Sequence, residues 1–380
     1  MVEKSRLVGL VKSGAMSMAE ACRLAGVSRK TGYKWMDRFE ERGVAGFDEL
    51  SRAPKRRPWA LPRSTQRTVI ALRKKRPTWG PRKLLAWLAQ HEPELELPAP
   101  STVGELLKRE GLVRSRRRRR GPQQATPTAL QEPRAPNDCW CVDFKGQFVV
   151  SHRYCYPLTA SDAYSRFILG CDALDATRTE LALPVFERLF EDYGLPWAIR
   201  SDNGPPFAST GLGGLSKLSV WWVRLGIRLE RIPPGKPQHN GRHERMHRTL
   251  KAETAAPPAE SVPAQQRRFD TFRLDFNIER PHEALGNEVP AAVYQPSTRS
   301  FPRVLPELEY PSPYALRSIR HDGTMRLLGQ EPYVSAALAG EVVGLEQTDD
   351  RLWRLYFGPI LLAIVDGRGK GVRLVPLPQK

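Results

Sequence analysis

Hydrophobic and polar residues alternate with a period of two in the middle of the chain, which is the pattern of half-buried β-strands. In the run from Cys139 to Gly146, Trp140, Val142 and Phe144 share one face and Asp143 lies on the other. Similar runs alternate with longer segments that favour helix. The pattern predicts strands at 139–150, 153–160, 166–173 and 197–202, and helices near 178–193, 214–225, 241–254 and 264–278. We expect an α/β domain here.

The segment from residue 16 to residue 43 predicts a helix-turn-helix. Ser17 to Ala25 forms one helix, Gly26 makes the turn, and Ser28 caps a second helix that runs from Arg29 to Arg42. The apolar contacts of this second helix are expected from Tyr33, Trp35, Met36 and Phe39. A second helical module is predicted from Ser64 to about Leu112, with helices at 65–75, from Pro81 onward and at 101–110.

After Pro296 the pattern changes to short β-prone runs, such as Trp353 to Phe357 and Ile360 to Val365, which suit a small β-barrel. The fold class expected for the whole chain is therefore multidomain α+β. The expected divisions are a helix-turn-helix domain at 1–46, a basic linker at 47–63, a second helix-turn-helix-like domain at 64–121, a tether at 122–135, an α/β core at 136–296 and the small barrel at 297–380.

Charge is concentrated at the N-terminal side of the chain. The formal net charge is +19, and residues 1–121 hold 29 Lys and Arg against 12 Asp and Glu, which leaves 31 against 29 for the rest. A basic arm ahead of a nearly neutral remainder is typical of a segment that binds a polyanion such as DNA.

Two further features narrow the class of protein. No apolar run reaches the 18 or more residues of a membrane-spanning helix, so no membrane partner is expected. The five cysteines are scattered and odd in number, which predicts free thiols in a reducing, cytoplasmic compartment.

Three carboxylates lie in contexts that suit a metal ion. Asp143 is on the polar face of its strand, Asp202 follows a β-prone run stopped by Asn203 and Gly204, and Glu244 opens a predicted helix for which Asn240 is the expected N-cap. Strand ends of this kind are where α/β sheets bind ligands. Carboxylates are the ligands that Mg²⁺ prefers, and two ions about 3.5–4 Å apart can clamp a phosphoryl-transfer reaction.

Three runs of sequence carry a resemblance to a known family: SDNGPPFAS at 201–209, PPGKPQHNGRHERMHRTLKAE at 233–253 and NIERPHEALGNEVPAAVY at 277–294. They resemble the catalytic core of bacterial insertion-sequence transposases of the retroviral-integrase-like DDE superfamily, over about half of the chain. The resemblance implies an RNase-H-like α/β core in which Asp143, Asp202 and Glu244 form the DDE triad and hold two Mg²⁺ ions per site, for which Mn²⁺ substitutes.

The same resemblance implies the reaction and the partners. The substrate is double-stranded DNA, both the terminal inverted repeats of a mobile element and the target, and the reaction is strand cleavage followed by strand transfer. A homo-oligomer assembled on paired DNA ends is implied as well. The chain departs from the family in one respect: 41 residues separate Asp202 from Glu244, where the family usually has about 35. We assign the excess to the Gly-rich stretch from Thr210 to Ser216, as an insertion in a surface loop.

The sequence also predicts residues that contact DNA, because basic and small polar side chains on exposed helices and linkers reach phosphates and base edges. Arg248 and Lys251 follow Glu244 at helical spacings that place all three on one stripe. The predicted DNA contacts are Ser28, Arg29, Lys30, Thr31, Lys34, Arg38, Arg56, Arg57, Ser101, Thr102, Lys108, Arg116, Arg117, Arg118, Arg119, Arg120, Arg248 and Lys251.

Two other functions compete with this hypothesis. The run from His243 to His247 matches H-E-x-x-H, in which two histidines bind zinc and the glutamate acts as the general base of a protease. In the transposase hypothesis His247 has no ligand role, because a helix turns it about 60° away from Glu244. The second competitor is a sequence-specific DNA-binding protein with an inactive nuclease-like core. Asp162 is assigned to a turn with Ser165 and not to the triad.

Overall fold

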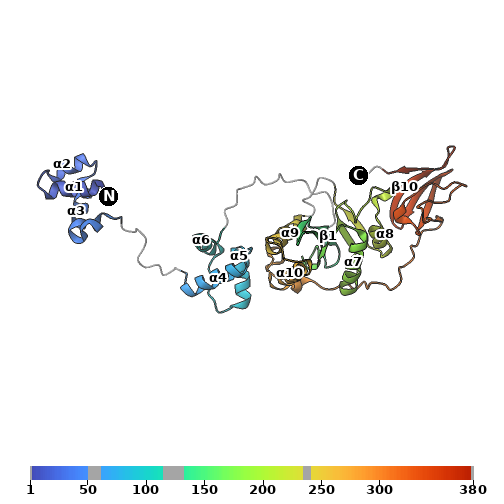
Figure 1. Cartoon of the computed structure of the whole chain (residues 1–380), viewed down its shortest axis with the longest axis horizontal. Coiled ribbons are helices and arrows are strands. Elements are labelled where there is room, and N and C mark those ends of the chain that lie inside the picture. Colours follow the sequence, from blue (N-terminus) through green and yellow to red (C-terminus); the bar gives the residue numbers. More distant parts are fainter. Residues whose placement is uncertain (1, 50–60, 114–131, 234–240, 378–380) are drawn as a thin grey trace. The chain divides into compact units, whose positions relative to one another are not determined.

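The computed structural model describes residues 2–49, 61–113, 132–233 and 241–377 (Figure 1). They form two compact units, residues 1–61 and 62–380. Among the described residues, no helix is both long enough and apolar enough to cross a membrane. All five cysteines are buried free thiols, as the sequence predicts.

The first unit is a small helical bundle of α1 (Val2–Lys12), α2 (Met18–Leu24), α3 (Arg29–Arg42) and a 3-10 turn, η1 (Gly43–Phe47). The predicted cap is present: the Ser28 side chain accepts from the Thr31 amide. Ser17, expected as the first residue of its helix, is instead the N-cap of α2 and closes a capping box there. Gly32 allows α3 to approach α2 closely, because a Cβ there would collide with the Cys22 sulfur.

Two sequence-based expectations for this unit are corrected. The helix α1 was not predicted, yet its Leu7 and Val8 are buried against Cys22 and Phe47. Tyr33 was expected in the apolar contacts but is 55% exposed, because the bundle buries the other side of α3. Trp35, Met36 and Phe39 pack against the core as expected.

The second unit begins with three helices, α4 (Arg63–Lys75), α5 (Pro81–His91) and α6 (Pro100–Arg109). Proline occupies the first turn of both α5 and α6, where the missing amide hydrogen costs nothing. Leu84, Leu88 and Val103 are fully buried between these helices. The helical module predicted for this region is therefore present.

A mixed sheet follows, made of β1 (Trp140–Phe144), β2 (Phe148–Val150), β3 (Arg153–Asp162), β4 (Ile168–Leu174), β5 (Ala198–Ser201) and β6 (Arg228–Arg231). Its order is β2-β3-β1-β5-β6, and β4 pairs with β3. The strands β1 and β3 are antiparallel, whereas β1, β5 and β6 run parallel to one another. The fold is that of an α/β core, as expected.

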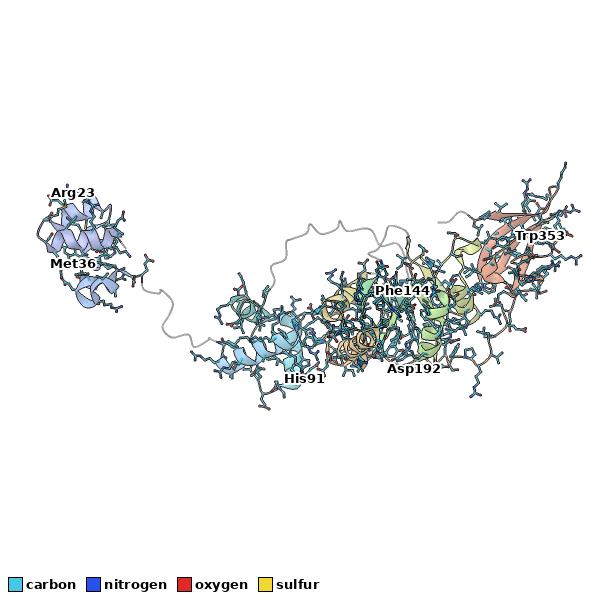
Figure 2. The ribbon with its side chains drawn as sticks, viewed as in Figure 1. Arg23, Met36, His91, Phe144, Asp192 and Trp353 are labelled. Atoms are coloured by element: carbon cyan, nitrogen blue, oxygen red, sulfur yellow. The ribbon has the colours of Figure 1, made fainter. Side chains whose placement is uncertain are left out.

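Helices cover both faces of this sheet. On one face, α7 (Thr179–Tyr193) and α8 (Lys217–Arg224) bury Phe186, Phe190 and Trp222 against Trp140. Phe144, labelled in Figure 2, stacks at an angle on Phe207, with ring centroids 5.7 Å apart. On the other face, α9 (Gly241–Thr254) and α10 (Val262–Leu274) bury Leu250 and Phe269.

The long strand predicted at 139–150 is divided into β1 and β2, which both pair with β3. The break lies opposite Pro157, which has no amide hydrogen to donate to the ladder, and Gly146 turns there with a φ of +86°. The strand β6 was not predicted, because three of its four residues are charged and show no alternation of apolar and polar positions. It is stabilised by an ion pair between buried Arg200 on β5 and Glu230, with 2.8 Å between Nη2 and Oε2.

The C-terminal part is an antiparallel sheet of β7 (Ala315–Ser318), β8 (Val342–Asp349), β9 (Leu352–Phe357), β10 (Ile360–Asp366) and β11 (Arg373–Pro376), in the order β11-β10-β9-β8-β7. Within the described strands, β7 and β11 are the two ends of this order and do not pair with each other. The region is rich in sheet as predicted, but the closed barrel is not confirmed.

The Gly-rich stretch at residues 210–216, expected as a surface loop, is exposed or half-buried as far as Gly214, but it also contacts the C-terminal sheet. Its 3-10 turn η2 (Leu212–Gly214) packs on β10, and Leu215 is completely buried in a cluster with Leu355, Phe357 and Leu362. Gly213 is needed in this contact: its φ is +65°, and a Cβ there would lie 2.6 Å from the Leu362 side chain. The insertion therefore attaches the C-terminal sheet to the α/β core.

Removing the buried side chain of this insertion should weaken that attachment. We expect Leu215→Ala to lower the free energy of unfolding of the full chain by about 3 kcal/mol, because the deletion leaves a cavity in the shared cluster. The exposed neighbour Thr210→Ala is the matched control. Urea denaturation followed by tryptophan fluorescence measures both, and equal stabilities of the two variants would contradict the packing described here.

Candidate active site

Asp143 and Asp202 come together because their strands are parallel neighbours in register. Trp140 pairs with Ile199 and Cys141 with Arg200, and continuing this offset two residues further places Asp143 beside Asp202. Asp202 is exposed just after β5, and its Oδ1 accepts from the Gly204 amide at 3.2 Å, which closes the predicted turn. The side-chain amide of Asn203 donates from Nδ2 to the carbonyl oxygen of Ile232 at 2.8 Å, and this bond holds the turn against the end of β6.

Glu244 lies in the first turn of α9 as an exposed side chain. Its charge acts on Asp143. Burial, together with the negative charges of Asp202 and Glu244, raises the pKa of Asp143 to about 7. The charges of Asp202 and Glu244 thus act on Asp143, and a cation would offset them. Among the described residues, the group of possible metal ligands that lie within 4.8 Å of one another contains Asp143 but neither Asp202 nor Glu244.

A buried hydrogen-bond network lies directly behind Asp143. The Thr159 hydroxyl on β3 is 3.0 Å from the carbonyl oxygen of Asp143, and 2.7 Å from the Nε2 atoms of both His243 and His247 on α9. The Ser161 hydroxyl is 2.9 Å from Nδ1 of His243. Burial lowers the pKa of His243 to about 3 and that of His247 to about 2, so both imidazoles are neutral at physiological pH.

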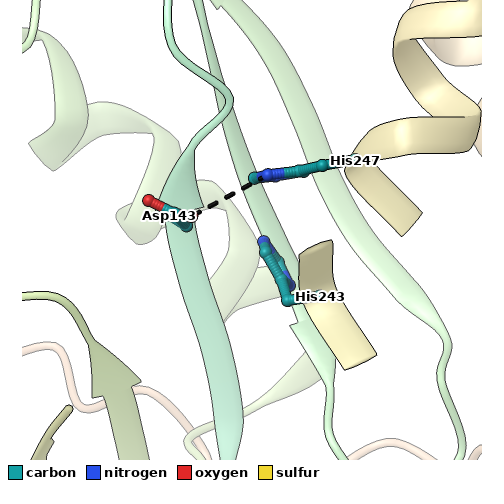
Figure 3. A group of neighbouring side chains, drawn as sticks. All are labelled: Asp143, His243 and His247. Atoms are coloured by element: carbon teal, nitrogen blue, oxygen red, sulfur yellow. Dashed lines mark ion pairs between the residues drawn. The ribbon is translucent and has the colours of Figure 1, made fainter. Parts of the chain in front are cut away.

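The remaining nitrogen of His247 faces the acid site. Its Nδ1 lies 3.8 Å from Oδ2 of Asp143, as the dashed line in Figure 3 shows. Together with His243 the two residues form a group whose possible ligand atoms all lie within 4.8 Å of one another. The sequence assigned His247 no role at the site, since helical spacing alone turns it away from Glu244.

Alternation in β3 is the signal that could have revealed this network. Leu158 and Ala160 belong to the core on one side of the sheet, whereas Thr159 and Ser161 point to α9 on the other. A pair of hydroxyl residues on one face of a buried strand requires polar partners. Histidines spaced four apart on a helix can supply them.

The geometry does not suit a zinc protease of the H-E-x-x-H kind. In that motif the two histidine nitrogens converge on a metal at about 2.0–2.1 Å. Here both Nε2 atoms converge on the Thr159 hydroxyl at hydrogen-bond distance, and this oxygen takes the place that the zinc ion would need. Asp162 is also not an acid of the site: it accepts from the Ser165 amide and hydroxyl at 2.7 and 2.6 Å, as the predicted turn requires.

The predicted DNA contacts lie on α9, on the first unit, on α6, or outside the described residues. Arg248 and Lys251 are exposed on the same side of α9 as Glu244, as their spacing predicts. In the first unit Arg29, Lys30 and Lys34 are exposed, Arg38 is half-buried, and Ser28 and Thr31 bond to each other in the cap, with 2.9 Å between their hydroxyl oxygens. Ser101, Thr102 and Lys108 are exposed on α6. The remaining positions lie outside the described residues: Arg56, Arg57, Arg116, Arg117, Arg118, Arg119 and Arg120, together with the expected N-cap Asn240.

Four family models match the chain. Two described as an integrase core domain match residues 133–237 and 225–290, which run from ahead of β1 to beyond α10 and include all three acids. A helix-turn-helix domain model matches residues 3–57, and a homeodomain-like domain model matches residues 31–107.

Two relatives are proteins of bacterial insertion elements. The chain is 27% identical over 209 residues to the uncharacterized 31.7 kDa protein of insertion element IS407 from Burkholderia multivorans, a match that covers 54% of this chain and 73% of the relative. It is 26% identical over 284 residues to the uncharacterized 39.2 kDa protein of insertion element IS476 from Xanthomonas euvesicatoria, which covers 73% of this chain and 72% of the relative.

Viral proteins are similar to shorter parts of the chain. The chain is 33% identical over 116 residues to the Gag-Pol polyprotein of baboon endogenous virus, and this match spans 30% of the chain but only 6% of the polyprotein. A solved structure of the HTLV-2 integrase catalytic core domain in complex with magnesium covers 43% of this chain and 99% of its own, with 14% identity and a TM-score of 0.34.

The Thr159 hydroxyl should stabilise the fold through its hydrogen bonds and not through the volume that the side chain fills. We expect Thr159→Val to lower the free energy of unfolding by about 3 kcal/mol, because the N–H groups of two buried imidazoles lose their acceptor. Thr159→Ser keeps the hydroxyl, and we expect it to retain most of the stability. Urea denaturation of the full chain distinguishes the variants, and a valine variant as stable as the wild type would refute the network.

Proposed function

We propose that this chain is a DNA transposase. Helix-turn-helix domains that bind DNA come first in the sequence, and an integrase core of the DDE type follows them. The chain cuts DNA strands and joins them to other DNA. The observation that supports the mechanism best is the in-register alignment of Asp143 with Asp202, next to the charge of Glu244. We assign these three residues as the catalytic acids.

The three carboxylates fit divalent cations. They are oxygen donors of the kind that Mg²⁺ prefers. Burial, together with the charges of Asp202 and Glu244, raises the pKa of Asp143, and a bound cation would offset this effect. We assign Asp143, Asp202 and Glu244 as ligands of two Mg²⁺ ions, with Mn²⁺ as a substitute. When bound, the ions supply activation of the attacking oxygen and neutralisation of the leaving oxygen.

The protein's own side chains position the DNA. Arg248 and Lys251 extend from the exposed side of α9 that also carries Glu244, where they can bind the phosphates that flank the scissile bond. Water first attacks the phosphodiester at the element end and releases a 3′-hydroxyl. That hydroxyl then attacks a phosphodiester of the target, so one bond forms as another breaks.

We further propose that residues 1–121 recognise the terminal inverted repeats. The basic residues Arg29, Lys30 and Lys34 are exposed on the N-terminal half of α3, the part of a recognition helix that meets base edges in the major groove. The division into a helix-turn-helix domain (1–46), linker (47–63), second binding domain (64–121), tether (122–135), catalytic core (136–296) and C-terminal domain (297–380) is part of this proposal. So is assembly of several copies on paired ends.

Removing any one of the three acids should abolish catalysis. We expect Asp143→Asn, Asp202→Asn and Glu244→Gln each to reduce joining of labelled end DNA in Mg²⁺ or Mn²⁺ by about 10³-fold or more, the equivalent of about 4 kcal/mol of transition-state stabilisation. Asp192→Asn removes an exposed carboxylate of α7 and is the matched control.

Two outcomes of that assay would count against the mechanism. A folded Asp143→Asn protein that still joins DNA ends would remove Asp143 from the catalytic acids. A wild-type protein that binds end DNA specifically but never cleaves or joins it would favour the competing function, a DNA-binding protein with an inactive core.

Base recognition by α3 is tested separately. We expect Arg29→Ala and Lys30→Ala to lower the preference for element ends over random duplex by about 5- to 150-fold, since a good base contact provides about 1–3 kcal/mol of discrimination. Arg42→Ala, at the far end of the same helix, should leave the preference unchanged. Equilibrium binding at fixed salt measures each ratio. Equal losses on both kinds of DNA would place the recognition surface elsewhere.

A further inference from the structure

The hydrogen-bond network behind Asp143 determines which nitrogens of the two histidines carry hydrogen. A threonine hydroxyl has one hydrogen to donate and can accept two hydrogen bonds. One partner of Thr159 is the carbonyl oxygen of Asp143, which can only accept, so the hydroxyl hydrogen is directed there. The Nε2 atoms of His243 and His247 must therefore both donate to Thr159.

This assignment leaves the two imidazoles in different situations. In a neutral imidazole that donates from Nε2, Nδ1 carries a lone pair. For His243 that lone pair accepts from the Ser161 hydroxyl, so both of its nitrogens are occupied. For His247 the lone pair of Nδ1 is directed at the site, where the nearby Oδ2 of Asp143, at 3.8 Å, is an acceptor as well.

Nδ1 of His247 and Oδ2 of Asp143 are both acceptors, and at 3.8 Å a cation between them would bind to both. A hydrogen bond between them would need a distance below about 3.2 Å, whereas two metal–ligand bonds of about 2.1 Å span nearly 4 Å. The side chain of His247 is 7% exposed and that of Asp143 23%, so the imidazole is held from inside while the carboxylate remains open to the site.

We propose that Nδ1 of His247 is a nitrogen ligand of the metal ion held at Asp143. The inference rests on the proposed function, which places a divalent ion at that carboxylate. His243, although it belongs to the same group of possible ligands, is excluded because both of its nitrogens are hydrogen-bonded. Its role is to position α9 on β3.

A nitrogen ligand changes which metal the site favours. Both Mg²⁺ and Mn²⁺ bind oxygen ligands, but Mn²⁺ is a transition-metal ion and accepts an imidazole nitrogen more readily than Mg²⁺ does. The ion at Asp143 should therefore be bound more tightly as Mn²⁺ than as Mg²⁺. Substituting His247 should reduce the affinity for Mn²⁺ by about 10-fold or more, by analogy with the loss seen when groups that support a metal site are removed, and should affect Mg²⁺ less.

The decisive experiment is electron-spin-echo envelope modulation of Mn²⁺ added to the full chain at or below one equivalent. A directly bound imidazole produces modulation from ¹⁴N that carboxylates cannot produce. We expect this signal in the wild type, its loss in His247→Gln, and its retention in His243→Gln, the matched control on the same helix. Glutamine can still donate to Thr159 from a position close to Nε2, so His247→Gln removes the lone pair and keeps the network.

The same samples separate this inference from the proposed function. Mn²⁺ that is bound without ¹⁴N modulation, in a wild-type protein that joins DNA ends, would overturn the role of His247 and leave the function intact. Modulation that persists in His247→Gln, or that disappears in His243→Gln while that protein remains folded, would also overturn it. A wild-type protein that binds no Mn²⁺ would overturn both proposals.

Discussion

The placement of the whole acid site depends on one buried hydroxyl, that of Thr159. It joins three elements at once: its own strand β3, the backbone of β1 at Asp143, and the inner face of α9 through His243 and His247. The helix that carries Glu244 is thereby fixed to the strand that carries Asp143. A buried network of this kind is stable only when every member has its partner, so the geometry of the site is specified sharply.

Asp143 lies in surroundings that disfavour its charge. Burial, and after it the negative charges of Asp202 and Glu244, raises the pKa of this carboxyl. The stabilising interactions lie behind the site and not within it: aromatic packing on the α7 and α8 side of the sheet, and the polar network on the α9 side. The carboxylates are therefore held by side chains that pack and bond behind them.

The C-terminal sheet is joined to the core by side chains that the catalytic fold does not itself require. Leu215, Val220 and Val223 belong to the same buried cluster as the residues of β8, β9 and β10. Arg224 at the end of α8 adds an ion pair to Glu341 with 2.8 Å between Nη1 and Oε2. A single helix, α8, thus contributes one face to the α/β core and another to the sheet, and couples the stability of the two.

Local sequence determined the elements of this protein. The alternation around Asp143, the cap at Ser28, and the turn of Asp162 with Ser165 were all predicted, because each depends on residues within a few positions of one another. The pattern around Asp143, Asp202 and Glu244 also indicated the chemistry. Family models and relatives confirm the class of protein that this pattern predicted.

Only the tertiary structure decided what depends on distant partners. The strand β6 is identified by its pairing with β5. Tyr33 is exposed because the bundle buries the opposite side of α3, and Leu215 is buried because the C-terminal sheet packs on it. His247 is the clearest case. Helical geometry turns it away from Glu244, yet the strand packed beneath α9 supplies a hydroxyl that orients its ring toward Asp143. The spacing of residues along a helix or strand determines the face on which a side chain lies. Which groups that face contacts depends on the element packed against it.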